Sequence, residues 1–189
     1  VNQDQFADVM RELNDKRAVF KRLVAERGGH EGLMAAVRQA LGLGPGETVD
    51  VVLNTAATDT AFDAAGLKQA VEAPGHGTKT DQERARGIGA WLAMTPAHRA
   101  NALAGDYANQ FLTKDRDARK KITTKGTDEA DPGAEAILRT EQERLLAMVQ
   151  RLKACAMAAA TESLLIVGEA LLAAYERIKR TRALLDYDD

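Results

Sequence analysis

Hydrophobic residues recur at steps of three and four positions along most of the chain, with charged residues between them. This spacing is typical of amphipathic helices. The first stripe predicts a single helix that ends at Gly28-Gly29, with Asn2 and Gln5 able to cap its start. The stripe consists of Phe6, Val9, Met10, Leu13, Phe20, Leu23 and Val24.

Two further stripes follow these glycines. The first stops before the turn Gly44-Pro45-Gly46 and consists of Leu33, Met34, Val37 and Leu41. The next apolar run, over 47–54, is too short for periodicity to distinguish a strand from a helix. Another helix is predicted over 60–73, ahead of Pro74-Gly75. Its apolar face holds Phe62, Leu67, Ala70 and Val71.

Two threonines mark later helix starts. Thr80 is followed three residues on by Glu83, which is the spacing of a capping box. The buried face of that helix is predicted to hold Ile88, Trp91 and Leu92. Thr95-Pro96 combines a cap with a proline suited to the first helical turn, and predicts a helix or a helix pair. Its apolar residues are Leu103, Tyr107, Phe111 and Leu112.

The pattern changes after Leu112. A small hairpin and a plain loop both fit the polar stretch 114–121, and 126–133 is interpreted as a polar connector. Asp131-Pro132 then opens an uninterrupted helical pattern to about Leu185. Fifty residues of straight helix would reach about 75 Å, whereas a compact domain of this length has a radius of gyration of about 16 Å. We therefore expect the helix to bend, break or protrude, with 161–163 and Gly168 as candidate bends.

The long helix carries an apolar stripe that predicts the spine of the core, packed along the N-terminal helices. The stripe consists of Leu145, Val149, Leu152, Leu164, Leu171 and Tyr175. The predicted fold class is all-α: an irregular helical bundle with one long, bent C-terminal helix, with or without a short β-hairpin. We expect a single helical subdomain over residues 1–189.

Composition excludes several classes of protein. The 26 Lys and Arg against 28 Asp and Glu give a net charge of -2, so any nucleic-acid contact must be a local patch. The lone cysteine, Cys155, excludes a disulfide framework and favours a reducing, cytoplasmic compartment. No run of about eighteen apolar residues and no signal-peptide leader is found, so no membrane contact is predicted. Because Val1 is not a methionine, we expect a segment of a longer protein.

Most residues with reactive side chains have a plain structural interpretation. His30, His76 and His98 have no second ligand at helical spacing, so no metal or acid–base role is predicted. The segment 75–80 is similar to a phosphate loop, but it lacks a glycine directly before Lys79 and a preceding strand. A flexible linker that ends in the cap Thr80 is the better interpretation. Cys155 is predicted to be a buried helical thiol.

The most basic stretch follows Thr113, where six cations stand against Asp115 and Asp117. It is the candidate site for binding DNA phosphates, and a solvated loop is the alternative. The six cations are Lys114, Arg116, Arg119, Lys120, Lys121 and Lys125.

Two other charged clusters have structural interpretations. Arg177, Lys179, Arg180 and Arg182 fall in the last turns of the long helix, where cations complement the helix dipole. The acidic segment 186–189 has no flanking ligands for a metal, and Asp186 is interpreted as a helix stop.

The C-terminal segment 175–189 resembles a part of the UvrD/Rep-type superfamily 1 DNA helicases. In that family a helix ends in a Leu-Asp-[Phe/Tyr]-Asp-Asp signature, matched here by Leu185-Asp186-Tyr187-Asp188-Asp189, and closes an accessory helical subdomain of the first motor domain. A second stretch is similar to the corresponding insert of AddA, the helicase-nuclease subunit of the AddAB recombination complex. It consists of Phe111-Leu112-Thr113-Lys114-Asp115, Arg119-Lys120 and Thr124-Lys125. Phe6, Gly28-Gly29 and Gly44-Pro45-Gly46-Glu47 are similar to the alphaproteobacterial type of this insert.

The resemblance implies a subdomain that contacts duplex DNA, without sequence preference, in an ATP-dependent helicase-nuclease that repairs double-strand breaks. The implied partners are the motor and nuclease domains of the parent chain and an AddB-like second subunit. ATP and magnesium would belong to the parent, because the 189 residues contain no Walker loop and no motor or nuclease motif. The chain itself is expected to bind no cofactor and to catalyse nothing. The alternative is a helical docking module with no DNA contact.

Overall fold

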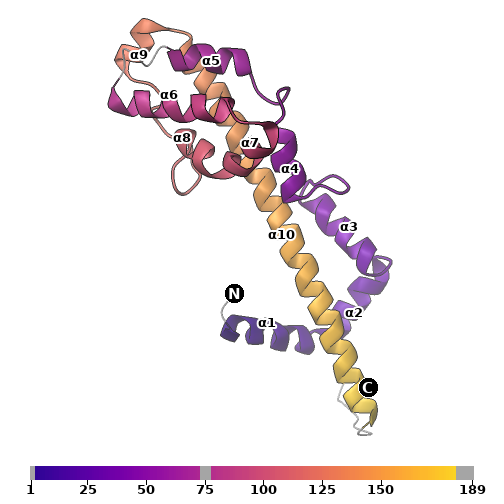
Figure 1. Cartoon of the computed structure of the whole chain (residues 1–189). Coiled ribbons are helices and arrows are strands. Elements are labelled where there is room, and N and C mark those ends of the chain that lie inside the picture. Colours follow the sequence, from indigo (N-terminus) through magenta and orange to yellow (C-terminus); the bar gives the residue numbers. More distant parts are fainter. Residues whose placement is uncertain (1–2, 73–77, 182–189) are drawn as a thin grey trace. The chain divides into compact units, whose positions relative to one another are not determined.

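The computed structural model describes residues 3–72 and 78–181 (Figure 1). Over these ranges the chain forms helices joined by turns, and the only strand-like feature there is an isolated bridge between Leu112 and Ala118. The predicted all-α fold is confirmed. The chain divides into two compact units: a terminal unit, formed by Val1–Pro45 with Ala156–Asp189, and a central unit, Gly46–Cys155.

The first predicted helix of the terminal unit is wrong in one respect, because it is two helices: α1 (Gln3–Asp15) and α2 (Arg17–Glu26). The interruption at Lys16 follows Asn14 and Asp15, whose short polar side chains compete with helical hydrogen bonding. The predicted end at Gly28-Gly29 is confirmed. Both glycines have positive φ (79° and 91°), and the Gly29 amide donates to the carbonyl of Val24 at 2.8 Å.

The rest of the terminal unit consists of α3 (His30–Ala40) and the second part of the long helix α10 (Ala134–Thr181). Leu33 and Met34 are buried on α3, and Leu172 is buried on α10. A Cβ atom at Gly168 would lie 2.5 Å from Cδ2 of Leu13, so this glycine allows α1 to approach α10 closely.

In the central unit, short helices gather around the first part of α10 (Figure 1). They are α4 (Val49–Ala56), α5 (Ala64–Glu72), α6 (Lys79–Leu92), α7 (Pro96–Ala102), the π-helical turn η2 (Leu103–Tyr107), α8 (Ala108–Phe111) and α9 (Lys125–Ala130). Segment 47–54, which periodicity left open, belongs mostly to α4, where Oγ1 of Thr48 accepts a hydrogen bond from the amide of Val51 at 3.2 Å.

Two predictions for the central unit are wrong. The capping box of α6 uses Thr78 and Asp81, two residues before the predicted pair Thr80 and Glu83. The polar segment 126–133 is not simply a connector, because α9 occupies Lys125–Ala130. This helix has no apolar stripe of its own, and Thr127 is buried by contacts from outside the helix, including Asp81.

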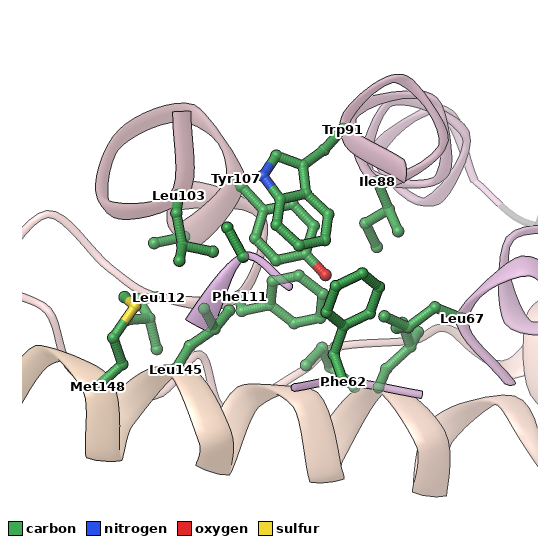
Figure 2. Packing of buried hydrophobic residues seen from close by; sticks show 14 of the residues in the cluster. Phe62, Leu67, Ile88, Trp91, Leu103, Tyr107, Phe111, Leu112, Leu145 and Met148 are labelled. Atoms are coloured by element: carbon green, nitrogen blue, oxygen red, sulfur yellow. The ribbon is translucent and has the colours of Figure 1, made fainter. Parts of the chain in front are cut away.

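Aromatic rings fill the middle of the central unit (Figure 2). Trp91 stacks on Tyr107 with ring centroids 3.8 Å apart, Phe62 packs at a tilted angle against Trp91, and Phe111 packs at a tilted angle against Tyr107. Indole Nε1 of Trp91 donates to the carbonyl of Arg99 at 3.1 Å. Leu145 and Met148 close the cluster from α10, as Figure 2 shows. The predicted buried residues Ile88 and Trp91 are confirmed.

α10 is one helix of 48 residues, with no interruption at the predicted bends. The hydroxyls of Thr161 and Ser163 donate to the carbonyls four residues back, at 2.8 and 2.9 Å, beside the helical ladder and not in place of it. The predicted burial is confirmed at Leu145 and Val149, which pack in the central unit and not along the N-terminal helices, and Leu152 is partly buried against the same core. It is wrong at Leu164 and Leu171, which are exposed, whereas Leu172 is buried. A seven-residue step departs from the 3.6-residue period by only about 20°, so periodicity does not explain why Leu164 and Leu171 are exposed. In this part of α10 the helices α1, α2 and α3 cover one side, and their contacts at Gly168, Glu169 and Glu176 decide which residues are buried.

One helix among the described residues meets the length and composition required to cross a membrane. It is α10, in which an 18-residue window has a mean hydropathy of 1.6. The sequence prediction concerned an uninterrupted apolar run, which is a different measure, because Thr161, Glu162 and Ser163 interrupt the apolar residues here. Only Glu162 and Glu169 are charged between residues 154 and 174. Glu169 lies 3.3 Å from Nδ1 of His30, so α3 of the terminal unit contacts this segment.

Candidate nucleic-acid interface

The predicted DNA-contact residues lie on the loop between α8 and α9, which we call the basic loop (residues 113–124). Lys114, Arg119, Lys120 and Lys121 are exposed on it, Arg116 is half-buried, and the exposed Lys125 opens α9. The Thr113 amide donates to the Asp117 carbonyl at 2.8 Å, and the Arg119 amide donates to the Phe111 carbonyl at 3.1 Å. The sequence left open whether this stretch is a small hairpin or a plain loop. The structure shows a tight loop with a single isolated bridge, between Leu112 and Ala118.

Side chains of α10 hold the backbone of the basic loop in place through hydrogen bonds. Nη1 and Nη2 of Arg139 donate to the carbonyls of Arg119 and Lys120 at 3.2 and 2.7 Å. The buried Gln142 donates through Nε2 to the carbonyls of Phe111 and Arg119 at 2.8 and 3.1 Å. Because these donors bind backbone oxygens, they fix the course of the loop and leave its lysine ammonium groups in solvent.

Arg84 of α6 adds a buried cation beneath the loop. Its guanidinium donates to the carbonyl of Gln110 at 3.0 Å and to the carbonyl of Ile122, and it lies 3.5 Å from Oδ1 of Asp81. Burial lowers the pKa of Arg84, Asp81 opposes this effect, and the charge of Arg119 adds to it. Arginine nevertheless stays protonated in proteins, so this charge lies permanently under the loop.

Asp81 joins α6 to the end of the basic loop. Its Oδ2 accepts hydrogen bonds from the hydroxyls of Thr124 and of Thr127, the latter at 3.3 Å, and from the amide of Thr78 at 3.1 Å. Burial alone would raise the pKa of Asp81, but the hydrogen bonds from these threonines outweigh it and leave the pKa below its ordinary value. The carboxylate is therefore ionised at neutral pH and fixes the start of α9.

Two of the six cations, Arg116 and Arg119, donate hydrogen bonds to Asn109. Nη1 of Arg116 donates to Oδ1 of Asn109 at 3.0 Å, and Nε and Nη2 of Arg119 donate to its carbonyl at 3.3 and 3.1 Å. Arg116 has φ of 67°, the left-handed region that residues with a Cβ rarely adopt, and is the one described non-glycine residue that does so.

Lys125 also has a partner, because its Nζ lies 3.5 Å from Glu129. Of the six predicted residues, Lys114, Lys120 and Lys121 therefore remain as exposed cations for which the structure gives no ion pair within the described part of the chain. Asp115 and Asp117 are exposed on the same loop and reduce its net positive charge.

The second basic cluster lies close to an acidic residue, Glu176, at the end of α10. Lys21 of α2 pairs with Glu176, and the pKa of Glu176 is lowered first by this hydrogen bond and also by Lys179 and Arg180. Lys179 and Arg180 thus have an acidic neighbour on the same helix, and their complementing of the helix dipole stays a prediction. Arg182 and the acidic segment 186–189 lie outside the described residues.

The remaining candidates have ordinary structural partners. Nδ1 of His98 lies 2.9 Å from Oγ1 of Thr95, the cap of α7. Cys155 is buried, with Sγ 3.7 Å from the carbonyl of Glu47. Lys79 is exposed beside Glu83, and His76 with the rest of 75–77 lies outside the described residues. Within residues 3–72 and 78–181, no His, Cys, Asp and Glu side chains form a group that could hold a metal.

Sequence reasoning missed a buried polar cluster on α10. Arg144 donates to both carboxylate oxygens of Glu141 at 2.7 Å, and the hydroxyl of Tyr107 donates to Oε1 of Glu141 at 2.8 Å. Burial, followed by the charge of Glu141, raises the pKa of Tyr107 far above its ordinary value. The Glu-x-x-Arg spacing was the available signal. Arg144 and Glu141 also line a hollow of about 530 Å³ together with Phe62 and Thr140.

Comparison of the chain with models of known protein families, with curated proteins and with solved structures finds no match.

Proposed function

We propose that the chain is a DNA-contacting helical accessory module of an ATP-dependent helicase-nuclease that repairs double-strand breaks by recombination. The observation that carries the DNA contact is the exposure of Lys114, Lys120 and Lys121 on a loop held by Arg139 and Gln142. Because the loop backbone is already ordered, little conformational entropy would be lost when it binds phosphate. The setting in a helicase-nuclease rests on the family resemblance of the sequence.

The chemistry of the basic loop fits phosphates and not base edges. A lysine ammonium group is a compact charge that contacts phosphate oxygens without reading sequence. The chain would therefore hold duplex DNA without sequence preference, beside the motor and nuclease domains of the parent and an AddB-like subunit. ATP and magnesium would be bound by those parent domains, so the isolated chain should turn over no ATP.

Fluorescence anisotropy of a labelled duplex across a salt series tests this proposal. Three phosphate contacts give a salt slope of about -3 in the logarithm of the binding constant, and an affinity no tighter than about 1 to 100 µM at physiological salt. The triple variant Lys114→Glu/Lys120→Glu/Lys121→Glu should lose binding and keep its circular dichroism spectrum. Arg119 is left intact, because its side chain bonds Asn109 and its loss would disturb the loop.

The matched control is the triple variant Arg177→Glu/Lys179→Glu/Arg180→Glu, which changes the net charge by the same amount at the end of α10. It should bind the duplex nearly as well as the wild type and should lose stability, because these cations complement the helix dipole. Equal loss of binding in both variants would mean that only net charge matters, and the assignment to the basic loop would be wrong.

The second candidate function is a docking module for the motor domains or the partner subunit. Val9, Val19 and Leu23 are exposed apolar residues of α1 and α2 and favour it. Apolar docking is nearly indifferent to salt, whereas phosphate binding weakens steeply as salt rises. If no salt-sensitive DNA binding is measured even at low ionic strength, the docking module replaces the first proposal.

A further inference from the structure

One face of α10 in the terminal unit is apolar and exposed. Met157, Leu164, Leu171 and Ile178 follow one another at seven-residue intervals, and their exposed fractions are 58%, 38%, 38% and 52%. Ala160, Val167 and Ala174 each lie three residues after one of the first three. We call these seven residues the heptad seam. A repeat of apolar residues at alternating steps of three and four is the pattern with which helices pair in coiled coils.

The heptad seam is separate from the face of α10 that α1, α2 and α3 cover. That covered face contains the buried Ala158, Gly168 and Leu172, and it carries the ion pairs of Glu176 with Lys21 and of Glu169 with His30. On a helix with 3.6 residues per turn, the two faces are about 120° apart. The covered face extends to Tyr175, over whose ring Arg17 of α2 lies at 5.7 Å, and the large residues of the seam remain exposed beside it.

We propose that the heptad seam binds the same seam of a second copy of this chain, as an antiparallel helix pair. The seam extends over about 33 Å of helix. A contact of this length covers on the order of 500 Å² on each copy, which just reaches the roughly 1,000 Å² in total of a specific interface. The dimer should accordingly be weak, with a dissociation constant on the order of micromolar.

The seam matches itself when the two helices run in opposite directions. The midpoint of the seam lies between Val167 and Gly168, so Leu164 of one copy would oppose Leu171 of the other, and Met157 would oppose Ile178. Large residues then meet large residues along the whole contact, and the alanines on either side of Val167 also face one another. The seam itself contains no charged residue.

The basic end of α10 favours the antiparallel direction. A parallel pair would bring Arg177 and Arg180 of both copies together at one end, where like charges repel. In the antiparallel pair these cations would lie beside residues 154–158 of the other copy, which are Ala, Cys, Ala, Met and Ala. Opposed helix dipoles also attract in this arrangement.

Sedimentation equilibrium of the full chain tests the pairing. The wild-type mass should rise from 20.4 kDa towards twice that value between low and high micromolar concentration. The variant Leu164→Glu/Leu171→Glu should remain a monomer at every concentration with unchanged helicity, because both residues are exposed in the single copy. The control is Ile166→Glu, which places one glutamate on an exposed apolar residue outside the seam. It should dimerise like the wild type.

Disulfide trapping tests the direction, in a background in which Cys155→Ser removes the native thiol. Val167→Cys should cross-link with itself on oxidation. Met157→Cys should not cross-link with itself, but should do so with Ile178→Cys when the two proteins are mixed. Self-linking of Met157→Cys would overturn the antiparallel arrangement.

Three results would overturn the pairing itself. They are a wild-type chain that stays monomeric throughout, a control variant that dissociates as fully as the seam variant, or a monomer that binds neutral phosphatidylcholine vesicles through the seam. The last result would assign the seam to a lipid surface. The DNA assay involves the basic loop of the central unit, so either proposal can fail without the other.

Discussion

A single carboxylate, Asp81, connects three parts of the central unit: the start of α6, the end of the basic loop and α9. The same residue explains why the predicted capping box was displaced. Thr78 with Asp81 and Thr80 with Glu83 have the same local spacing, so sequence alone gives no basis for choosing between them. The choice is made by Thr124 and Thr127, which lie more than forty positions away and donate to Asp81 but not to Glu83.

Replacing Asp81 tests how its carboxylate contributes to the free energy of unfolding as pH falls. Because the pKa of Asp81 is lower in the folded chain than in the unfolded one, its contribution is present above about pH 4 and is lost as pH falls below that value. Asp81→Asn should therefore reduce the free energy of unfolding at pH 7 by about 3 to 5 kcal/mol, since it leaves the buried Arg84 without its charge partner. Urea denaturation at pH 7 and pH 3 measures this.

The difference between Asp81→Asn and the wild type should shrink at pH 3, where the wild-type carboxylate begins to take up a proton. The control is Asp115→Asn, an exposed aspartate of the basic loop, which should change little at either pH. A loss of stability in Asp81→Asn that is equal at both pH values would show that the network depends on shape and not on charge.

At the scale of elements, the long helix shows where periodicity succeeds and fails. The apolar stripe predicted the buried residues correctly where α10 packs in the central unit, at Leu145 and Val149. Beyond residue 155, apolar side chains occur on more than one side of the helix, so periodicity alone does not identify the side that the rest of the chain buries. Only the contact with α1 to α3 determines which of two neighbouring leucines is buried.

Two substitutions at neighbouring positions test which side of α10 is buried. Leu172→Ala should reduce the free energy of unfolding by about 2 to 5 kcal/mol, because the side chain is 4% exposed and its loss leaves a cavity. Leu171→Ala should cost much less, because that side chain is 38% exposed. Thermal melting followed by circular dichroism compares the two variants. Equal losses would mean that the helix has a different rotation about its axis in solution.

The basic loop illustrates a second limit of prediction from sequence. Its cations were visible as a run of charges, and five of the six are exposed as expected. The donors that hold it, Arg139 and Gln142, come from α10 and bond the backbone carbonyls of the loop, not its side chains. No local pattern marks such contacts, because a carbonyl is present at every residue. The short helix α9 was missed for a similar reason, since its burial comes from Asp81 and not from its own apolar residues.

At the scale of the whole molecule, the central unit is one continuous segment, and the terminal unit is built from two separated segments. The central unit also contains the aromatic cluster and most of the buried hydrophobic residues that the structure describes. The sequence prediction of one subdomain gave no sign of this division, because α10 runs through both units without a break in its helical pattern.

Residues 46–155 should therefore fold when produced alone. Trp91 is the only tryptophan of the chain and is buried against Tyr107, so its fluorescence reports on this core. We expect the fragment to show a blue-shifted emission and a cooperative urea transition, because its core residues lie within the segment. As a control, Trp91→Phe should remove the signal and retain helicity. An emission typical of exposed tryptophan would contradict independent folding.

Cys155 gives the chain a natural reporter of slow opening. It is the only thiol, it is 4% exposed, and it lies at the last residue of the central unit with its Sγ against the carbonyl of Glu47. A reagent such as Ellman's can reach it only while that contact is broken, so the labelling rate is proportional to the population of the open state. Without any substitution, labelling kinetics would thus report how often the end of the central unit separates from the start of α4, and whether bound DNA slows that opening.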